Sequence, residues 1–514
     1  MSADPAAADP TTAPSNSPDG SRHELLRVLG LGIAIAMVVG NTIGSGIFRK
    51  PGLIAADADS FPLIIVGWIG GGIVCLLGAL CFAELAAMLP RAGGMYNYLK
   101  EAYGKPVAFL YGWSEFFFGT PASCGALSIM ILETLAPICG FKEQLNEITL
   151  VAGSVLLIAF VAFVNVRGAI WGGNVQGVTT VIKAGSVALI ALLPLVLLLF
   201  GNSALDWANF TSHFDRSQFD SAISTLPQEK FDAQTVPRYT TLGAQMAAIL
   251  LAVMWSYNGW DGVAPVAAEV RDPNRNIPRA LFAGVGILIL VYVGANVAYH
   301  GVLNMTELVE TPGTTAQTML RKQLGVFGPS WATLAVTILS VVIAISSFGA
   351  INSNLMQSPR VAYALGHDGV FFQKLGHVHA TYRTPTIAIC TQATMASLMV
   401  VGARISKYYV AALKTRDLFD ILTDYVIFSA SIFLVLSVIG VIVLRFKHPE
   451  WHRPYRTLGY PVTPLLFVGF YLWFLPTAYR LESFAAHVAL ILIALGLPAY
   501  FLYAAFRKPS GTEY

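Results

Sequence analysis

The chain has 514 residues, of which 55% are hydrophobic and only 12% are charged, and its mean hydropathy is +0.63. Soluble globular proteins carry about twice that share of charged residues, so the composition indicates a polytopic membrane protein. The net charge is only +3, and no basic stripe indicates a nucleic-acid partner. The ten-residue alternation of a transmembrane barrel is missing as well, so the predicted fold class is all-α.

Apolar windows of about 20 residues predict twelve membrane spans, which places the chain in a lipid bilayer. Residues 1–24 are small, polar and acidic with several prolines, which predicts a disordered cytoplasmic tail and not a signal peptide. An even number of spans puts both termini on one side. The modest excess of lysine and arginine in the loops that then face inward predicts that both termini are cytoplasmic, at a plasma membrane.

Two of the predicted spans are interrupted. The stretch GNTIGSGIFRKPG, residues 40–52, breaks the first span, and AVMWSYNGWDGVAPVAAEV contains a similar break in the sixth. Glycine weakens a helix by about 1 kcal/mol relative to alanine, and backbone groups freed in lipid need other partners. Breaks in the first and sixth spans fit two five-helix repeats of inverted topology, and such matched breaks indicate a transporter binding site. Close helix packing through glycine is the alternative.

Each break predicts a polar backbone site. A broken helix has unpaired N–H groups at the start of its second half and unpaired carbonyls at the end of its first half. An α-amino acid zwitterion carries both charges about one residue length apart, so two facing breaks match it in charge and scale. The predicted groups are the N–H groups around Gly44, Ser45 and Gly46 and the carbonyls near Thr42, Trp255 and Ser256.

Four stretches carry a family resemblance: GNTIGSGIFRKPG, FAELAAMLPRAGGMYNYLKEAYG, WSYNGWDGVAPVAAEVRDPNRNIPRA and SSFGAINSNLMQSPRVAYALGHDGVF. They resemble the signature segments of the amino acid, polyamine and organocation (APC) superfamily, most closely its L-type amino acid transporter branch. The similarity runs from about Leu25 to Arg456. It implies a LeuT-like 5+5 inverted repeat with discontinuous first and sixth helices, and exchange or uptake of L-amino acids at the backbone of those two spans.

The resemblance also divides the chain. We expect the first five-helix repeat at 25–200 and the second at 241–446, separated by an extracellular loop at 201–240. Two peripheral helices are expected at 447–506, followed by a cytoplasmic tail at 507–514.

Lys183, in GVTTVIKAGSVALI, is the basic residue well inside a span, where an ionisable group is costly and indicates function. In the resembling family a lysine at this place on the fifth span occupies the site that holds sodium in sodium-coupled relatives. The resemblance therefore implies sodium-independent transport. A proton-coupling switch and an anchor that reaches the interface are the alternatives. The implied neighbours of Lys183 are Gly40, Asn41, Ser346 and Ser347.

The resemblance suggests further pocket residues. Trp255 stands where the family commonly has a gating phenylalanine, and a packed interfacial aromatic is the alternative. Asn258 falls where relatives often have glycine, and we expect it to add a hydrogen bond to the substrate. Small residues of the third span, Thr120 and Ser123 among them, are expected to line the side-chain pocket.

Glu115 and Glu84 are two of the acidic residues in predicted spans. We expect Glu115 near the inner end of the third span as a structural or interfacial group, although in the pocket it would favour cationic substrates. Glu84 is predicted to be an inner-gate or loop-anchoring partner of Arg91 or Arg360, with a solvated helix end as the alternative.

No cofactor or metal is predicted, because HxH alone is a weak metal motif and GSG lacks the phosphate-loop pattern. Four of the five cysteines lie in apolar runs and are expected in the core. A heavy-chain partner would rest on Cys139 alone, in a loop, and is not expected.

The predicted function is sodium-independent transport of L-amino acids, neutral ones favoured, by alternating access, with exchange or proton coupling. One alternative is a polyamine or amino acid/amine antiporter, for which Asp261 and Glu115 are the candidate acidic residues. Another is a non-transporting amino acid receptor, which the short tails disfavour. No enzyme is predicted, since no nucleophile and base pair lies at membrane depth.

Overall fold

The computed structural model describes residues 26–141, 145–213, 241–311, 313–410, 418–481 and 483–506. The expected tails at 1–24 and 507–514 lie outside these ranges, as does most of the expected loop at 201–240. In the described ranges the β-structure is limited to two isolated bridges, Leu29 with Val270 and Ser60 with His213. The all-α class is confirmed for this part of the chain.

Most of the described chain is helical, and each helix is bounded as follows. The first half contains α1 (Leu31–Thr42), α2 (Gly46–Ala58), α3 (Phe61–Met88), α4 (Met95–Tyr103), α5 (Lys105–Ser114), the π-helix η1 (Glu115–Gly119), α6 (Thr120–Leu135), α7 (Glu147–Val166) and α8 (Ala169–Leu199). The second half contains the 3-10 helix η2 (Trp207–Thr211), α10 (Leu242–Tyr257), η3 (Ala267–Glu269), α11 (Pro273–Val302), α12 (Met305–Val309), α13 (Thr315–Gly325), α14 (Pro329–His367), η4 (Gln373–Gly376), α15 (Thr386–Tyr409), α16 (Leu418–Lys447), α17 (Val462–Leu481) and α18 (Ser483–Phe506).

Eleven of the described helical segments, counting α1 with α2 and α5 with α6, are long and apolar enough to cross a membrane. The sixth predicted span differs, because it contains only the shorter apolar helix α10. Twelve full-length spans were expected. The described part of the chain contains eleven helical segments of that length and one shorter apolar helix. The second half of the sixth span is not a helix, for reasons given below.

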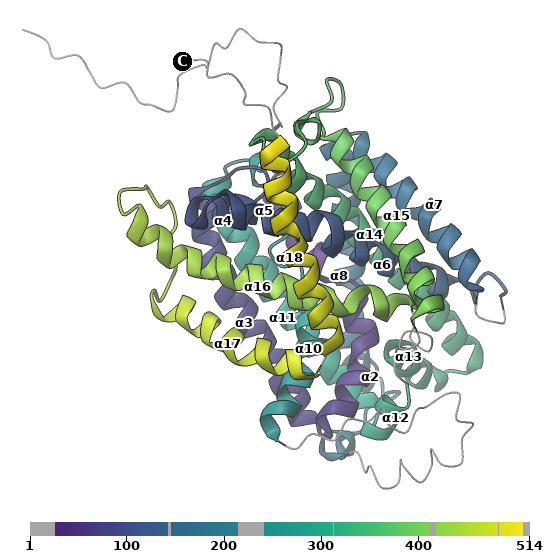
Figure 1. Ribbon diagram of the computed structural model, residues 1–514. Coiled ribbons are helices and arrows are strands. Elements are labelled where there is room, and N and C mark those ends of the chain that lie inside the picture. Colours follow the sequence, from purple (N-terminus) through teal and green to yellow (C-terminus); the bar gives the residue numbers. More distant parts are fainter. Residues whose placement is uncertain are drawn as a thin grey trace, which may run out of the picture.

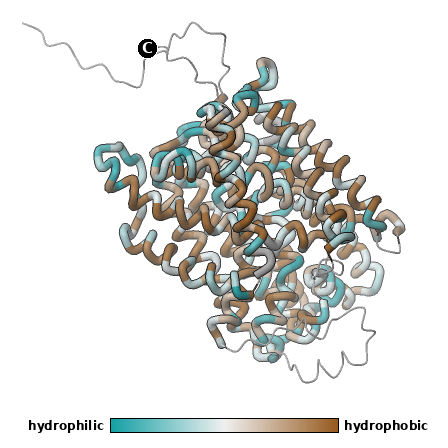
Figure 2. The backbone as a smooth tube through the Cα atoms, in the orientation of Figure 1, coloured by the Kyte–Doolittle hydropathy of each residue, from teal (hydrophilic) through white to brown (hydrophobic). Residues whose placement is uncertain are grey.

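The helices form one bundle, with α16 and α17 on one flank, α7 and α15 on the other, and α18 across the front (Figure 1). Helix α4 and the pair α12 and α13 lie at opposite ends, which we call the α4 end and the α12 end (Figure 1). Hydrophobic residues cover much of the helix flanks (Figure 2). Leu156 and Leu290 are 72% and 76% exposed, which fits a surface that faces lipid.

The break in the first span separates α1 from α2. Ile43–Ser45 is not helical, and α2 begins at Gly46. A Cβ atom at position 46 would lie 2.8 Å from the Cα atom of Ser256, so only glycine permits this approach of α2 to α10. The two interrupted spans therefore touch each other through their backbones.

The break in the sixth span ends α10 at Tyr257, and turns then lead to η3. Gly259 has φ +100°, which favours glycine, and the Asn41 side chain donates to its carbonyl at 3.1 Å. We expected a discontinuous sixth helix with two helical halves. Only the first half is α-helical, because Gly259, Gly262 and Pro265 do not sustain a helix after the break.

The third span contains a wide turn. Helices α5 and α6 are joined by η1, in which the Thr120 N–H donates to the Glu115 carbonyl five residues earlier. Pro121 explains this turn, because proline has no N–H and its ring clashes with the carbonyl four residues back. Single π turns of this kind occur often at functional sites.

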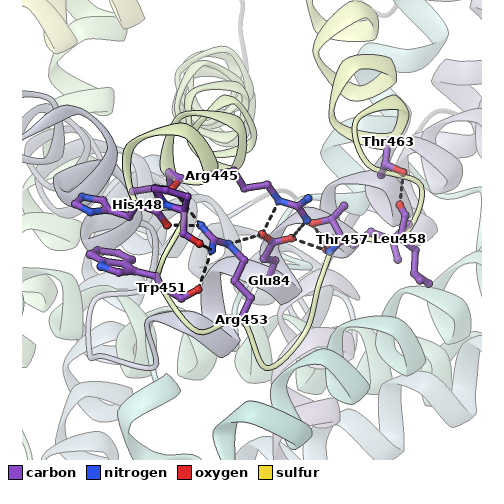
Figure 3. A network of polar contacts seen from close by, with 11 residues as sticks. Glu84, Arg445, His448, Trp451, Arg453, Thr457, Leu458 and Thr463 are labelled. Carbon is purple, nitrogen blue, oxygen red and sulfur yellow. Dashed lines mark hydrogen bonds and ion pairs between the residues drawn. The ribbon is translucent and has the colours of Figure 1, made fainter.

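An ion-pair network ties α3 to α16 at the end of each helix (Figure 3). Glu84, which is 1% exposed, accepts hydrogen bonds from Arg445 at 2.9 and 2.6 Å and from the Thr457 N–H at 2.7 Å. Arg453 lies 3.4 Å from the same carboxylate and donates to the Trp451 carbonyl at 2.8 Å. The network fixes the segment between α16 and α17 against α3.

The predicted partners of Glu84 were wrong. Arg91 pairs instead with Glu101 at 3.1 Å, and Arg360 pairs with Glu269 at 2.8 Å. The partner of Glu84 comes from the far end of the chain, which its neighbours in sequence do not indicate. The anchoring of a loop, which was part of the prediction, fits the observed contacts.

Helix α4 is held to the end of α14 by a second ion pair. Lys100 lies 2.7 Å from the Asp368 carboxylate, which also accepts a hydrogen bond from Tyr96 at 2.9 Å. Burial raises the pKa of Asp368, but the bonds from Lys100 and Tyr96 lower it more, so this pKa lies below its ordinary value of 3.8.

This shift predicts a loss of stability in acid. A depressed folded-state pKa stabilises the fold at neutral pH, and this contribution of about 1 kcal/mol disappears as pH falls through the folded-state value. We expect Asp368→Asn to lower the melting temperature in detergent at pH 7 but to weaken its decline in acid. Glu310→Gln, at an exposed residue of the α12 end, is the control. Equal acid sensitivity of Asp368→Asn and wild type would contradict the prediction.

Candidate functional site

A cavity of about 130 Å³ lies where the two interrupted spans meet. Its walls come from both breaks, from η1 and α6 of the third span, and from α14 and α16. At roughly 10–15 Å³ per water-sized probe, it has room for a small molecule. The predicted site residues that line it are Asn41, Thr42, Gly44, Ser45, Gly46, Thr120, Ser123, Trp255 and Asn258.

Other predicted site residues lie behind the cavity wall. Ser256 is buried, its hydroxyl donates to the Ala252 carbonyl at 3.2 Å, and it is not part of the lining. Lys183 and its predicted neighbours Gly40, Ser346 and Ser347 also lie outside the lining. The predicted residues therefore divide into a cavity group and a group buried behind the first break.

The start of α2 offers backbone donors to the cavity. The Gly44 N–H donates to the Thr42 carbonyl at 2.8 Å, so this predicted donor is already used. The N–H groups of Ser45 and Gly46 have no acceptor among the described residues. Unpaired N–H groups at a helix N-terminus bind anions such as carboxylates.

Tyr292, on α11, connects the two breaks and was not predicted. Its hydroxyl lies 3.1 Å from the Thr42 carbonyl and 2.9 Å from the Ser256 carbonyl, and its side chain is fully buried. Two of the predicted ammonium acceptors thus already contact a hydroxyl. The third, the Trp255 carbonyl, accepts from the Asn258 N–H at 3.2 Å and keeps a second lone pair. A tyrosine in the middle of the apolar run GILILVYVGANVAYH was the available sequence signal.

We expect Tyr292→Phe to reduce transport about 10-fold. The variant removes a hydroxyl that serves two carbonyls, and a hydrogen bond contributes about 0.5–1.5 kcal/mol. The measurement is uptake of labelled L-amino acid into proteoliposomes at matched protein density. Tyr299→Phe is the control, since its hydroxyl lies 3.3 Å from the Ile47 carbonyl in α2 and not at the breaks. Equal uptake by both variants would remove Tyr292 from the site.

Lys183, on α8, is fully buried, and its ammonium lies against the broken first span. It donates to the carbonyls of Gly40 and Ile43, the latter at 2.9 Å, and to the Ser346 carbonyl of α14 at 3.2 Å. The ammonium therefore joins α1, the break and α14 through three backbone oxygens. Carbonyl oxygens of this kind also coordinate alkali cations.

The predicted neighbours of Lys183 are thus found in part. Gly40 and Ser346 are hydrogen-bond partners, and Ile43 is an additional one that the sequence did not indicate. Asn41 instead donates to the carbonyl of Gly259 and to Gln357, at 3.1 and 3.4 Å. The Ser347 hydroxyl lies 3.8 Å from the Met130 sulfur.

Trp255 lines the cavity and contacts an aromatic residue of another span. Its ring lies 6.4 Å from that of Phe419 on α16, in an edge contact, and the Arg49 guanidinium lies over Phe419 at 4.5 Å. Trp255 and Phe419 come from two different spans, so the contact joins α10 to α16. A gating role for Trp255 stays a prediction.

Glu115 was expected near the inner end of its span. It lines the cavity instead. The π turn of η1 directs it there, and the Thr120 hydroxyl donates to its carboxylate. Asp261, from the irregular segment after α10, lines the same cavity. The sequence showed both residues but not the π turn.

The cysteines fall into two groups. Cys75, Cys81 and Cys124 are buried as expected, and Cys139 is exposed in the turn after α6. Cys390 is exposed on α15, which corrects the expected core position, because an apolar run can also face lipid. Within the described ranges, no group of three or more His, Cys, Asp and Glu residues could hold a metal ion.

A family model described as amino acid permease matches residues 29–503, which include both breaks, Lys183 and the whole cavity. The chain belongs to the amino acid permease family. This membership confirms the predicted resemblance to amino acid transporters of the APC superfamily. A permease of this family is a transporter and not an enzyme.

Several characterised relatives of this permease resemble it along most of its length. The serine/threonine exchanger SteT of Bacillus subtilis is 29% identical, over 93% of this chain and 97% of its own. The human large neutral amino acids transporter small subunit 2 is 30% identical, over 97% of this permease and 84% of its own chain. The human b(0,+)-type amino acid transporter 1 is 28% identical, over 94% of this permease and 89% of its own chain. All three are named as amino acid transporters or exchangers.

Proposed function

We propose that this permease is a sodium-independent transporter of L-amino acids that works by alternating access. The observation that carries the proposal is the meeting of two interrupted spans around one cavity. Ser45, Gly46 and Trp255 line that cavity; among the described residues the N–H groups of Ser45 and Gly46 have no acceptor, and the Trp255 carbonyl keeps a second lone pair. An α-carboxylate and an α-ammonium group require these two kinds of partner.

The fixed charge of Lys183 supports sodium independence. Its ammonium already lies on the carbonyls of Gly40, Ile43 and Ser346, where a second cation would meet a like charge at short range. Exchange and proton coupling both remain compatible with this arrangement. Exchange has the further support that a relative, the Bacillus subtilis protein, is named an exchanger.

The proposal includes a twelve-span architecture. We infer that α10 and the irregular segment after it form the sixth span, so that residues 25–200 and 241–446 form inverted repeats. Contacts between α2 and α10 at the two breaks support this pairing. We further propose a plasma membrane location with both termini cytoplasmic. No heavy-chain partner is proposed; among the described residues, the exposed Cys139 is the feature that would suggest one.

Neutral side chains are proposed as the main substrates, on the resemblance to the L-type branch and the names of the relatives. The small polar residues Thr120 and Ser123 on the cavity wall support side chains of modest size. Glu115 and Asp261 support a wider range, which the next subsection takes up.

Transport by the purified full-length chain in proteoliposomes tests the proposal. Vesicles are empty or preloaded with unlabelled L-amino acids, in sodium or in choline, and labelled L-leucine, L-serine and L-threonine are supplied outside. We expect uptake that requires preloading and that is equal in sodium and choline. Uptake into empty vesicles that follows an imposed pH gradient would select proton coupling. A requirement for sodium, or failure of every amino acid under all conditions, would overturn the proposal.

A further inference from the structure

Among the described residues that line the cavity, Glu115 and Asp261 are the acidic ones, and none is a lysine, arginine or histidine. Among the described residues, neither carboxylate forms an ion pair. The charge of Lys183 does not compensate them directly, because three backbone carbonyls hold its ammonium behind the cavity wall. An unpaired carboxylate at membrane depth is costly and indicates a functional site.

The geometry around Glu115 leaves one oxygen for a ligand. The Thr120 hydroxyl donates to Oε1. The other oxygen, Oε2, lies 3.1 Å from where a Cβ atom of residue 119 would be, so Gly119 leaves room beside it. A carboxylate that accepts one bond from the protein retains several lone pairs for further donors.

Ser358, on α14, adds a hydroxyl oxygen to the cavity lining. Its side chain is 3% exposed and lines the cavity, yet its hydroxyl has no hydrogen-bond partner in the part of the chain that the structure describes. A buried hydroxyl without a partner is uncommon and indicates an interaction that the ligand completes. Together with the two carboxylates, it supplies acceptors for a group that has several N–H donors.

These acceptors come from other segments of the chain than the groups that suit the substrate backbone. Asp261 precedes η3, whose Glu269 pairs with Arg360 and whose backbone accepts from the Leu29 N–H just before α1. Glu115 belongs to η1 of the third span, on a different element from the break of the first span. Ser45 and Gly46 belong to the break of the first span and the start of α2.

We propose that Glu115 and Asp261 bind the positively charged end of a basic side chain, so that the substrates include L-lysine, L-ornithine and L-arginine. This inference rests on the function proposed above. An ammonium has three donors and a guanidinium has five, which match the two carboxylates and the Ser358 hydroxyl. Binding of the cation offsets the cost of two like charges that share one cavity.

The test compares L-lysine with L-norleucine, which has the same carbon chain without the terminal ammonium. Purified full-length protein is reconstituted into preloaded vesicles at pH 7.5 on both sides, and exchange of each labelled amino acid is measured. We expect wild type to exchange both. Glu115→Gln and Asp261→Asn should each lower the ratio of lysine to norleucine exchange at least 10-fold. Glu101→Gln, which changes a carboxylate of α4 outside the cavity, should leave the ratio unchanged.

A second measurement uses the wild type alone, so its result does not depend on whether the variants fold. Entry of lysine in exchange for norleucine moves one net charge, so a potassium diffusion potential negative inside should speed it, while norleucine self-exchange should not respond. Exchange of norleucine without lysine would overturn the inference and leave the proposed function standing. Lysine exchange with an unchanged ratio in both variants would also overturn it. Failure of every amino acid would overturn the proposed function itself.

Discussion

Lys183→Ala should reduce amino acid transport about 10- to 100-fold. The variant removes an ammonium that donates to three carbonyls, those of Gly40, Ile43 and Ser346. A hydrogen bond to a charged group contributes about 1.5–3 kcal/mol, so one lost bond already accounts for a factor of this size. Initial rates of labelled L-amino acid exchange in proteoliposomes, at equal reconstituted protein, measure the effect.

Two further variants separate charge from packing. Lys183→Met keeps most of the side-chain volume without the charge, and we expect it to lose as much transport as Lys183→Ala. In the alanine variant the three carbonyls are left without a cation, so sodium or lithium in the buffer should restore part of the rate. Wild-type transport by Lys183→Ala, with an unchanged dependence on pH, would remove this lysine from the mechanism.

Of all these variants, Arg360→Met should lower the free energy of unfolding most, by about 3–5 kcal/mol. It leaves the buried carboxylate of Glu269 unpaired. Arg360 and Glu269 are each 1% exposed and form two hydrogen bonds, at 2.8 and 3.3 Å. The pair connects α14 to η3 at the α4 end, beside the backbone bond from Leu29 to Glu269 at 2.9 Å. We expect a marked fall in the melting temperature in detergent, read as loss of the monodisperse size-exclusion peak after heating.

The double variant Glu269→Gln with Arg360→Met provides the decisive comparison. It removes both charges, so most of the lost stability should return. Arg91→Met is the matched surface control, since Arg91 is 59% exposed in its pair with Glu101, and we expect a change of about 0.5 kcal/mol or less. If Arg360→Met were as stable as Arg91→Met, the buried pair would not hold the α4 end together.

The broken spans were the most predictable part of the site. Gly44, Gly46 and Gly259 act through local backbone chemistry, and local chemistry is what a sequence displays. The same reasoning failed for the second half of the sixth span, where Gly259, Gly262 and Pro265 together prevent a helix. The count of apolar residues alone predicted that the sixth span is a full-length helix.

The partners of charged residues were much less predictable. Glu84 meets Arg445, 361 positions away in the sequence, and no periodicity connects the two. The direction of Glu115 depended on a π turn, which follows from Pro121 six residues later only when the helix geometry is known. Tyr292 contacts both breaks from a span without any break. Such pairings come from tertiary packing, which a single sequence does not encode in any local pattern.

The position of Lys183 has a consequence for the energetics of the transport cycle. A sodium ion bound at those three carbonyls could leave on the other side of the membrane, and its gradient would then drive accumulation. The ammonium of Lys183 is covalently attached to α8 and returns with every cycle, so in the proposed exchange mode it couples no sodium gradient to the substrate. In exchange, the transporter would then alter the composition of the two amino acid pools but not their combined size.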